Sequence, residues 1–377
     1  MIKTILFDVD GVFLSEERYF DASALTVWEM LHSKAYLGLS GDTFTPQPVE
    51  NTIRDVRTTV FAQDEVLNFI KSRGINSNWD MVFLAFGYQL IRLCKHLQQK
   101  HPVEIKEILA NQIDRKELAT LASWNEELSG FEIDYAAFTP DFAKGAAQKA
   151  EMLLYLNTLA EEHCGVKTEM FSRNSDLWKL CQETFQEWYL GDQLVEQSIG
   201  RPTSQAGKKG FLTDEIPIVE PAKVRELLVE LKGKGITLGI GTGRPTIETH
   251  VPLEELGLLE LFDANRIVTA SHVLDAENEF PEEAPLAKPH PHCYVRGLLG
   301  LDKPIADVMN YSLPITNPKE VLIVGDSLAD YLAARSIGCL FAATLTGLSG
   351  QEARAKFEQE KADYILDDVS QILSIFQ

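Results

Sequence analysis

The sequence has few cysteines and no pattern that would cross-link them. The five cysteines lie far apart, are odd in number and include no Cys-x-x-Cys pair: Cys94, Cys164, Cys181, Cys293 and Cys339. This spacing argues against a disulfide framework and against a zinc site, and it favours reduced thiols. We therefore expect a protein of the cytoplasm.

Long hydrophobic runs are also missing. The longest apolar stretch, residues 81–91, is much shorter than the roughly 20 residues needed to cross a bilayer. The apolar run at the start of the chain is cut off by Asp8, so it lacks the hydrophobic region of a secretory signal peptide. We expect a soluble protein with no membrane partner.

Basic residues are much fewer than acidic ones. The chain has 35 Lys and Arg against 56 Asp and Glu, a formal net charge of -21 at pH 7. Such a charge repels nucleic acid at long range, so nucleic acid is not an expected partner. A small anionic ligand is still compatible with the sequence if its site gathers positive charge locally.

The length and the order of patterns predict two domains. A chain of 377 residues exceeds the roughly 250 to 300 at which single cores usually split. An apolar strand at residues 2–7 is followed by helical periodicity to about Gly191, with helices at 79–99, 142–163 and 176–190, the last capped by Asp176. Strands and helices then alternate, with strands at 236–240, 266–270, 321–324, 339–344 and 363–366 and helices at 220–232 and 328–336.

The first strand can pair only with these distant strands, because the helical region offers none. We therefore predict an α/β core, a Rossmann-like doubly wound parallel sheet formed by residues 1–15 and 211–377. A large all-helical cap domain, residues 16–210, is inserted after strand 1. The loop at 200–210 has a near match to a P-loop, but Pro202 replaces the required glycine, and we interpret it as a flexible hinge.

Polar residues follow three of the predicted strands. Asp8 and Asp10 end the first, Thr242, Gly243 and Arg244 follow the second, and the segment Gly325-Asp326-Ser327-Leu328-Ala329-Asp330 follows a later one. Ligands of open parallel sheets gather at the carboxyl ends of the strands, so we expect these residues to converge. Lys288, with prolines close after it in the sequence, lies in a loop that could join them.

Carboxylates, a hydroxyl and a lysine together suit phosphoryl transfer with Mg²⁺. Asp8 and Asp326 supply the oxygen ligands that a hard cation takes. A carboxylate can also act as a nucleophile, and Lys288 with the metal ion would neutralise phosphoryl oxygens. The residues therefore predict a magnesium-dependent phosphoryl-transfer site.

Four segments resemble, in the right order, the motifs of the haloacid dehalogenase-like hydrolase superfamily. The first motif, DxDG, matches Asp8-Val9-Asp10-Gly11, and the second, a strand ending in Thr or Ser, matches the strand ending at Thr242. The third is the lysine of Lys288-Pro289, and the fourth, GDxxxD, matches Gly325 to Asp330. The position of the insertion matches the helical cap type, although about 195 residues is large for such a cap.

The resemblance implies a role for each matching residue. Asp8 would be the nucleophile and Asp10 the general acid and base. The metal ion would be held by Asp8, the Asp10 backbone carbonyl and Asp326, with Asp330 supporting its waters or Lys288. The phosphoryl group would be bound by Asp8, Thr242, Gly243 and Lys288.

We predict a Mg²⁺-dependent phosphatase that hydrolyses a small phosphorylated metabolite through an aspartyl-phosphate, with the cap selecting the substrate. Dehalogenation is disfavoured because family members that remove halide lack the second aspartate, which is present here as Asp10. Two alternatives stay open: a sugar phosphomutase on the same fold, and a non-catalytic protein that uses the cap for interactions. The sequence fixes neither the substrate nor the oligomeric state.

Overall fold

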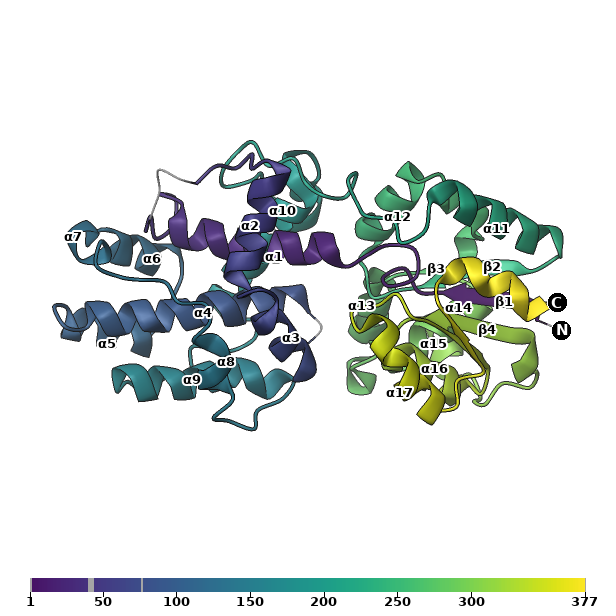
Figure 1. Cartoon of the computed structure of the whole chain (residues 1–377). Helices are drawn as coiled ribbons and strands as arrows, with labels where there is room; N and C mark the ends of the chain where they lie inside the picture. Colours follow the sequence, from purple (N-terminus) through teal and green to yellow (C-terminus); the bar gives the residue numbers. More distant parts are fainter. Residues whose placement is uncertain (1, 40–43, 76, 377) are drawn as a thin grey trace. The chain divides into compact units, whose positions relative to one another are not determined.

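The chain folds into two compact units. The computed structural model describes residues 2–39, 44–75 and 77–376. Unit 1 consists of Met1–Glu16 and Leu212–Gln377, and unit 2 of Glu17–Phe211 (Figure 1). Each unit is described by itself below.

Unit 1 is built on a parallel sheet. In the described residues its six strands have the order β3-β2-β1-β4-β5-β6. The strands are β1 (Thr4–Phe7), β2 (Thr237–Gly241), β3 (Ile267–Val268), β4 (Val321–Gly325), β5 (Leu340–Thr344) and β6 (Tyr364–Leu366). All the predicted strands are present, most of them slightly shorter than predicted, and the α/β fold class is confirmed.

The first strand lies inside the sheet, between two strands that come much later in the chain. Thr4 of β1 is in register with Thr237 of β2 on one side and with Val321 of β4 on the other. Both faces of β1 are covered: Ile5 and Phe7 belong to one hydrophobic cluster and Leu6 to the other. Burial on both faces explains why the strand is a continuous apolar run.

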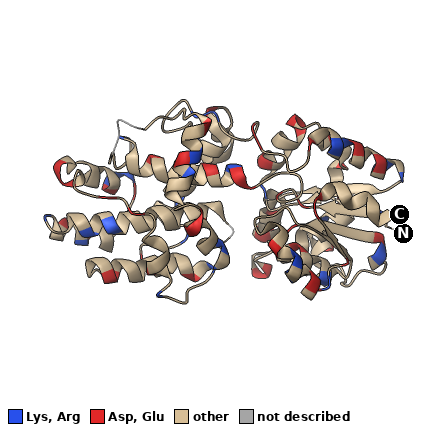
Figure 2. Ribbon diagram, in the orientation of Figure 1, with Lys and Arg blue, Asp and Glu red and all other residues tan. Residues whose placement is uncertain are grey.

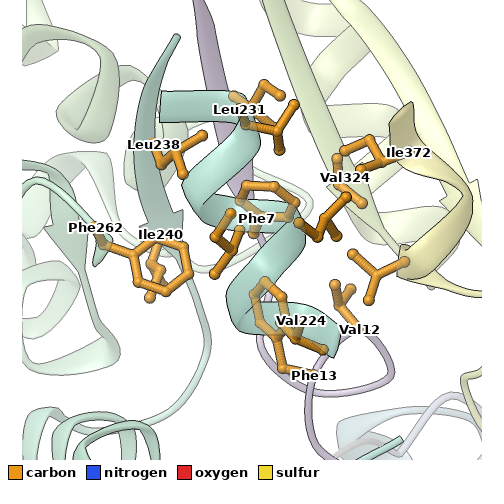
Figure 3. Close-up of a cluster of buried hydrophobic side chains, with 14 of the residues drawn as sticks. Phe7, Val12, Phe13, Val224, Leu231, Leu238, Ile240, Phe262, Val324 and Ile372 are labelled. Atoms are coloured by element: carbon orange, nitrogen blue, oxygen red, sulfur yellow. The ribbon is translucent and has the colours of Figure 1, made fainter. Parts of the chain in front are cut away.

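Helices cover both faces of this sheet. The helices of unit 1 are α11 (Pro221–Gly233), α12 (Thr246–Glu255), α13 (Ala270–Glu279), α14 (His292–Leu299), α15 (Ile305–Met309), α16 (Leu328–Ile337) and α17 (Ala353–Gln359), with a 3-10 segment at Val369–Phe376. Figure 3 shows Phe7 and Val324 of the sheet packed with Val224 and Leu231 of α11 and with Ile372. The other cluster contains residues of α13 to α17.

In its described residues, unit 2 has helices joined by loops and contains no strand. Its helices are α1 (Glu17–His32), α2 (Glu50–Val60), α3 (Glu65–Ser72), α4 (Asn78–Leu97), α5 (Pro102–Ala110), α6 (Arg115–Ala122), α7 (Asn125–Leu128), α8 (Phe138–Phe142), α9 (Ala150–Cys164) and α10 (Asp176–Ile199). Aromatic side chains join them; Tyr19 of α1 stacks on Tyr189 of α10 with ring centroids 4.4 Å apart.

Two predicted details of unit 2 are wrong, and a third is only partly right. The helix predicted to begin at 142 begins at Ala150. The cap of α10 is Ser175, whose side chain accepts a hydrogen bond from the Trp178 N–H, and Asp176 is already helical. Gly191 interrupts α10 with φ +71°, in keeping with the predicted end of a helix there, but helical residues continue to Ile199.

The segment after α10 is held firmly to unit 2, in contrast to the flexible hinge that its composition predicts. Lys208 is buried, and its Nζ lies 2.8 Å from Glu29 Oε2 and 2.5 Å from Glu187 Oε2. The Asp192 N–H donates to the carbonyl of Lys208, so the segment is also bound through its backbone. The segment is a loop, as predicted, but a loop that ion pairs anchor to α1 and α10.

Acidic residues are distributed over the helices of both units (Figure 2), in keeping with the large negative net charge. Within the described part of the chain, none of the helices has both the length and the apolar character required of a membrane span.

Candidate active site

The predicted site residues of unit 1 follow adjacent strands at one edge of the sheet. Asp8 comes directly after β1, Thr242 directly after β2, and Asp326 directly after β4. Because β1 lies between β2 and β4 and all three are parallel, these residues begin at the carboxyl edge where ligands of such sheets gather. Lys288 and Asp330 reach the same cluster from a loop and from α16.

Asp8 is buried and its carboxylate is in contact with Lys288. The Asp8 N–H continues the ladder by donating to the Val324 carbonyl at 2.8 Å. Oδ1 accepts the Val9 N–H at 2.8 Å, and Oδ2 lies 2.8 Å from Lys288 Nζ. Burial raises the pKa of Asp8 to about 7, assisted by the charges of Asp330 and Asp10 and opposed by Lys288.

Lys288 is placed between two carboxylates. Its Nζ lies 2.8 Å from Asp8 Oδ2 and 2.8 Å from Asp330 Oδ1, and 4.9 Å from the centre of the Tyr294 ring. Burial opposes the charge on Lys288, but Asp330 and Asp8 outweigh it and raise the pKa of the ammonium group. The two carboxylates therefore favour the charged form of Lys288.

Asp330 is fully buried and holds this lysine. Tyr294 Oη donates to its Oδ1 at 2.7 Å and Ser327 Oγ to its Oδ2 at 2.6 Å. Ser327 caps α16, and Asp330 completes the capping box. Burial acts to raise the pKa of Asp330, but Lys288 and these hydrogen bonds keep it below the usual value, which favours the ionised form of Asp330 beside the lysine.

The Asp326 side chain occupies a space that exists only because two neighbouring residues, Gly11 and Gly347, have no side chain. A Cβ atom on Gly11 would be 2.3 Å from Asp326 Cγ, and one on Gly347 would be 1.9 Å from Asp326 Oδ2. Gly11 is itself fixed, since its carbonyl accepts hydrogen bonds from Thr344 Oγ1 at 3.1 Å and Thr346 Oγ1 at 2.5 Å. Burial, together with the charges of Asp330, Asp8 and Glu16, raises the pKa of Asp326 well above its ordinary value.

The carboxylates of Asp8, Asp326 and Asp330 form a group that fits a divalent cation. One oxygen of each lies within 4.8 Å of one oxygen of the others. Their mutual repulsion would be relieved by a cation, and oxygen donors of this kind suit Mg²⁺. The Asp10 side chain is outside this group.

Asp10 instead faces an arginine. Arg244 donates to its Oδ1 through Nε at 2.8 Å and through Nη2 at 2.6 Å. Thr242 is buried, and its Oγ1 accepts the Arg244 N–H at 3.3 Å. Gly243 is exposed, with no atom near the place of a side chain, so its backbone can be approached by an oxygen of a ligand.

Sequence reasoning missed the residues that support this group. Tyr294, Thr344 at the end of β5 and Thr346 just after it carry no pattern that distinguishes them from core and loop residues. Ser327, three residues before Asp330, has the spacing of a capping box and was identifiable. Arg244 stands beside Thr242, but its contact with Asp10 depends on the pairing of β1 with β2.

Comparisons with known proteins agree with this geometry. The family model for haloacid dehalogenase-like hydrolases matches residues 2–338. The chain is similar to a phosphoglycolate phosphatase of Pasteurella multocida (strain Pm70), 32% identical over 157 residues, 41% of this chain and 56% of the relative. It is also similar to the pyrophosphatase PpaX of Bacillus mycoides (strain KBAB4), 32% identical over 164 residues, 43% of this chain and 61% of the relative.

The chain thus spans little more than half the length of these curated relatives. A solved structure extends the likeness to the whole chain. This X-ray structure from the Northeast Structural Genomics Consortium is 39% identical, covers 100% of this chain and 98% of its own, and has a TM-score of 0.88. Since the family match includes most of the chain and all four motifs, the protein belongs to the haloacid dehalogenase-like hydrolases.

Proposed function

We propose that the protein is a Mg²⁺-dependent phosphatase that hydrolyses a small phosphomonoester through an aspartyl-phosphate on Asp8. The contact of Lys288 with both Asp8 and Asp330, next to Asp326, carries the proposal. It brings a nucleophile, a positive charge and cation ligands together in one cluster, of which Asp8 and Asp330 are buried. The names of the curated relatives, both phosphatases, support the same reaction class.

In the first step, a carboxylate oxygen of Asp8 forms a bond to phosphorus as the bond to the leaving oxygen breaks. Protonated Asp10 gives its proton to that oxygen, so the product leaves as a neutral alcohol. In the second step, Asp10 takes a proton from water, the water oxygen bonds to phosphorus, and the bond to Asp8 breaks. Phosphate and a free Asp8 carboxylate result.

Charge on the phosphoryl oxygens would be neutralised by the lysine and by the cation. Lys288 would bind one oxygen, and the Thr242 side chain and the Gly243 backbone would bind others. Asp8, Asp326 and the Asp10 backbone carbonyl would hold Mg²⁺, with Asp330 acting through Lys288 or through waters on the metal. The cation supplies charge neutralisation and orients the phosphoryl group.

We also propose that unit 2 is a cap that selects the substrate, because its helices are inserted directly after the loop that carries Asp10. The two relatives act on different compounds by name, so the substrate is to be found by a screen. Suitable candidates are sugar phosphates, nucleotides, phosphorylated organic acids and pyrophosphate. A cytoplasmic location is supported by the cysteines, all five of which are free and buried.

The decisive experiment compares wild type with Asp8→Asn in phosphate release from 4-nitrophenyl phosphate and from the screen substrates, with Mg²⁺ and with EDTA. We expect the variant to lose at least about 10³-fold in turnover, as nucleophile removal does in other covalent enzymes. Acid-quenched wild type should carry phosphate on the peptide containing Asp8. The fold should persist, because Asn has nearly the size of Asp and Lys288 keeps its contact with Asp330.

Asp307→Asn, on the exposed surface of α15, is the matched control and should keep full activity. Comparable turnover in Asp8→Asn, or turnover unaffected by EDTA, would contradict the proposal. Release of an isomerised sugar phosphate without free phosphate would identify a mutase instead.

A further inference from the structure

Arg244 is the largest fully buried side chain of the described chain, and its charge is directed at Asp10. The residue is 2% exposed. Nε and Nη2 both donate to Asp10 Oδ1, at 2.8 and 2.6 Å. Two bonds from one planar guanidinium fix the direction as well as the distance of the carboxylate.

The other side of the guanidinium is anchored on a different segment. Nη1 lies 2.7 Å from Glu215 Oε1, and it donates to the Glu248 carbonyl at 3.2 Å. The Glu215 side chain is 2% exposed, so this is a buried ion pair. Burying a charge is costly without such partners, and the two carboxylates offset that cost here.

Glu215 belongs to the segment that returns to unit 1 from the helical insertion. That segment runs beside the outgoing one: the Ser15 N–H donates to the Ile216 carbonyl at 2.9 Å, and Leu14 forms an antiparallel bridge with Pro217. Asp10 begins the outgoing segment. The buried side chain of Arg244 therefore links the segment that leaves unit 1, through Asp10, to the segment that returns to it, through Glu215.

We propose that Arg244, anchored by Glu215, is the positioning residue that holds Asp10 by Oδ1 and so directs its other, protonated carboxyl oxygen toward the leaving oxygen, which receives the proton. The inference rests on the proposed function and extends it. A guanidinium does not give up its proton in a protein, so Arg244 is not itself the acid. Its effect is geometric, and small misplacements of a catalytic group reduce rates strongly.

The leaving group distinguishes this role from a purely structural one. An alkyl phosphate needs its leaving oxygen protonated, whereas 2,4-dinitrophenyl phosphate releases a stable anion and needs little help. The comparison uses kcat/KM, which reports steps up to formation of the aspartyl-phosphate and excludes its hydrolysis. The variants are Arg244→Lys, Glu215→Gln and Asp10→Asn in the full chain with Mg²⁺.

For Arg244→Lys we expect kcat/KM for the alkyl phosphate to fall roughly 10- to 100-fold, part of the 10²- to 10⁴-fold that general acid catalysis typically supplies. For the dinitrophenyl ester we expect a change of less than about threefold. Glu215→Gln should show the same pattern with a smaller loss. In an Asp10→Asn background, adding Arg244→Lys should change the alkyl reaction by less than about threefold, because the two residues act as one unit.

Arg225→Lys is the control, since Arg225 forms an exposed pair with Glu260 in the same unit, and both substrates should be unaffected. Equal losses on both substrates, or no loss on the alkyl phosphate, would overturn the inference. If Arg244→Lys fails to fold by circular dichroism, Glu215→Gln decides by the same criterion. An inactive wild type, or an active Asp8→Asn variant, would instead overturn the proposed function. The experiment therefore distinguishes failure of the proposed function from failure of the role proposed for Arg244.

Discussion

At the scale of single residues, the most restrictive contact is that of Asp326 with two glycines. Gly347 has an ordinary negative-φ backbone, so its requirement for glycine comes from space alone: a Cβ would lie 1.9 Å from Asp326 Oδ2. The loop after β5 thus lines one side of the Asp326 carboxylate, although no family motif includes this loop. Asp326 cannot keep its place if Gly347 in this loop gains a side chain.

Gly347→Ala should therefore weaken metal binding. Displacing a ligand through its neighbour typically costs 10- to 100-fold in affinity, and we expect a loss of at least roughly 10-fold for Mg²⁺. Titration calorimetry on the purified variant measures it without relying on turnover. Gly233→Ala, where the added methyl group meets nothing within 4 Å, should bind Mg²⁺ like wild type. Unchanged affinity in Gly347→Ala would mean that Asp326 does not hold the cation.

The residues that carry reactive groups were predictable, and those that hold them were largely not. Asp8 and Asp326 stand out because they directly follow apolar strands, and Lys288 because it matches a family motif between them. Tyr294 and Thr344 are ordinary core residues in sequence. Their hydrogen bonds to Asp330 and to the Gly11 carbonyl exist only after distant strands pair.

At the scale of elements, the segment between α10 and unit 1 shows how a buried ion can override local composition. Gly207 and Gly210 predict a loop with freedom to move, but Lys208 between them joins Glu29 of α1 to Glu187 of α10. All three side chains are fully buried. Burial raises the pKa of Glu29, whereas Lys208 and Arg201 overcome burial and lower the pKa of Glu187.

Lys208→Met should destabilise unit 2 by about 3 to 5 kcal/mol, because removing one partner leaves buried carboxylates without compensation. Denaturant unfolding followed by tryptophan fluorescence is a suitable measurement, since all five tryptophans lie in unit 2: Trp28, Trp79, Trp124, Trp178 and Trp188. Lys209→Met changes the neighbouring exposed lysine and should have little effect. Similar midpoints for the two variants would show that the triad contributes no stability.

At the scale of the whole molecule, the proposed metal ligands and the fluorescent reporters are in different units. Asp8, Asp326 and Asp330 all belong to unit 1. Mg²⁺ at about 100 times its dissociation constant stabilises the state that binds it by about 2.7 kcal/mol. The cation should therefore protect one unit selectively.

Hydrogen exchange with mass spectrometry tests this expectation. Peptides of β1, β2 and β4 should exchange more slowly with Mg²⁺ and return to their original rates with EDTA, while the tryptophan transition of unit 2 moves little. Asp326→Asn should abolish the protection. Equal protection of both units, or none in β1, would contradict a metal site confined to unit 1.

The division into two units could also be predicted in outline, since the isolated strand at residues 4–7 has partners only beyond residue 236. The internal architecture of unit 2 could not. Helical periodicity identifies α4 and most of α10, but the break at Gly191 and the late start of α9 depend on packing between helices. Local sequence patterns do not predict contacts between helices that are far apart in the chain.

The central position of β1 has a consequence for biosynthesis. A ribosome makes this strand before the helical insertion, and makes its neighbours β2 and β4 only after the entire insertion. Domains generally fold in order of emergence, so the insertion can become structured while β1 still waits as an unpaired apolar segment. Polypeptides arrested after the insertion and before β2 should therefore bind chaperones through the apolar residues of β1, although their helical domain is already folded.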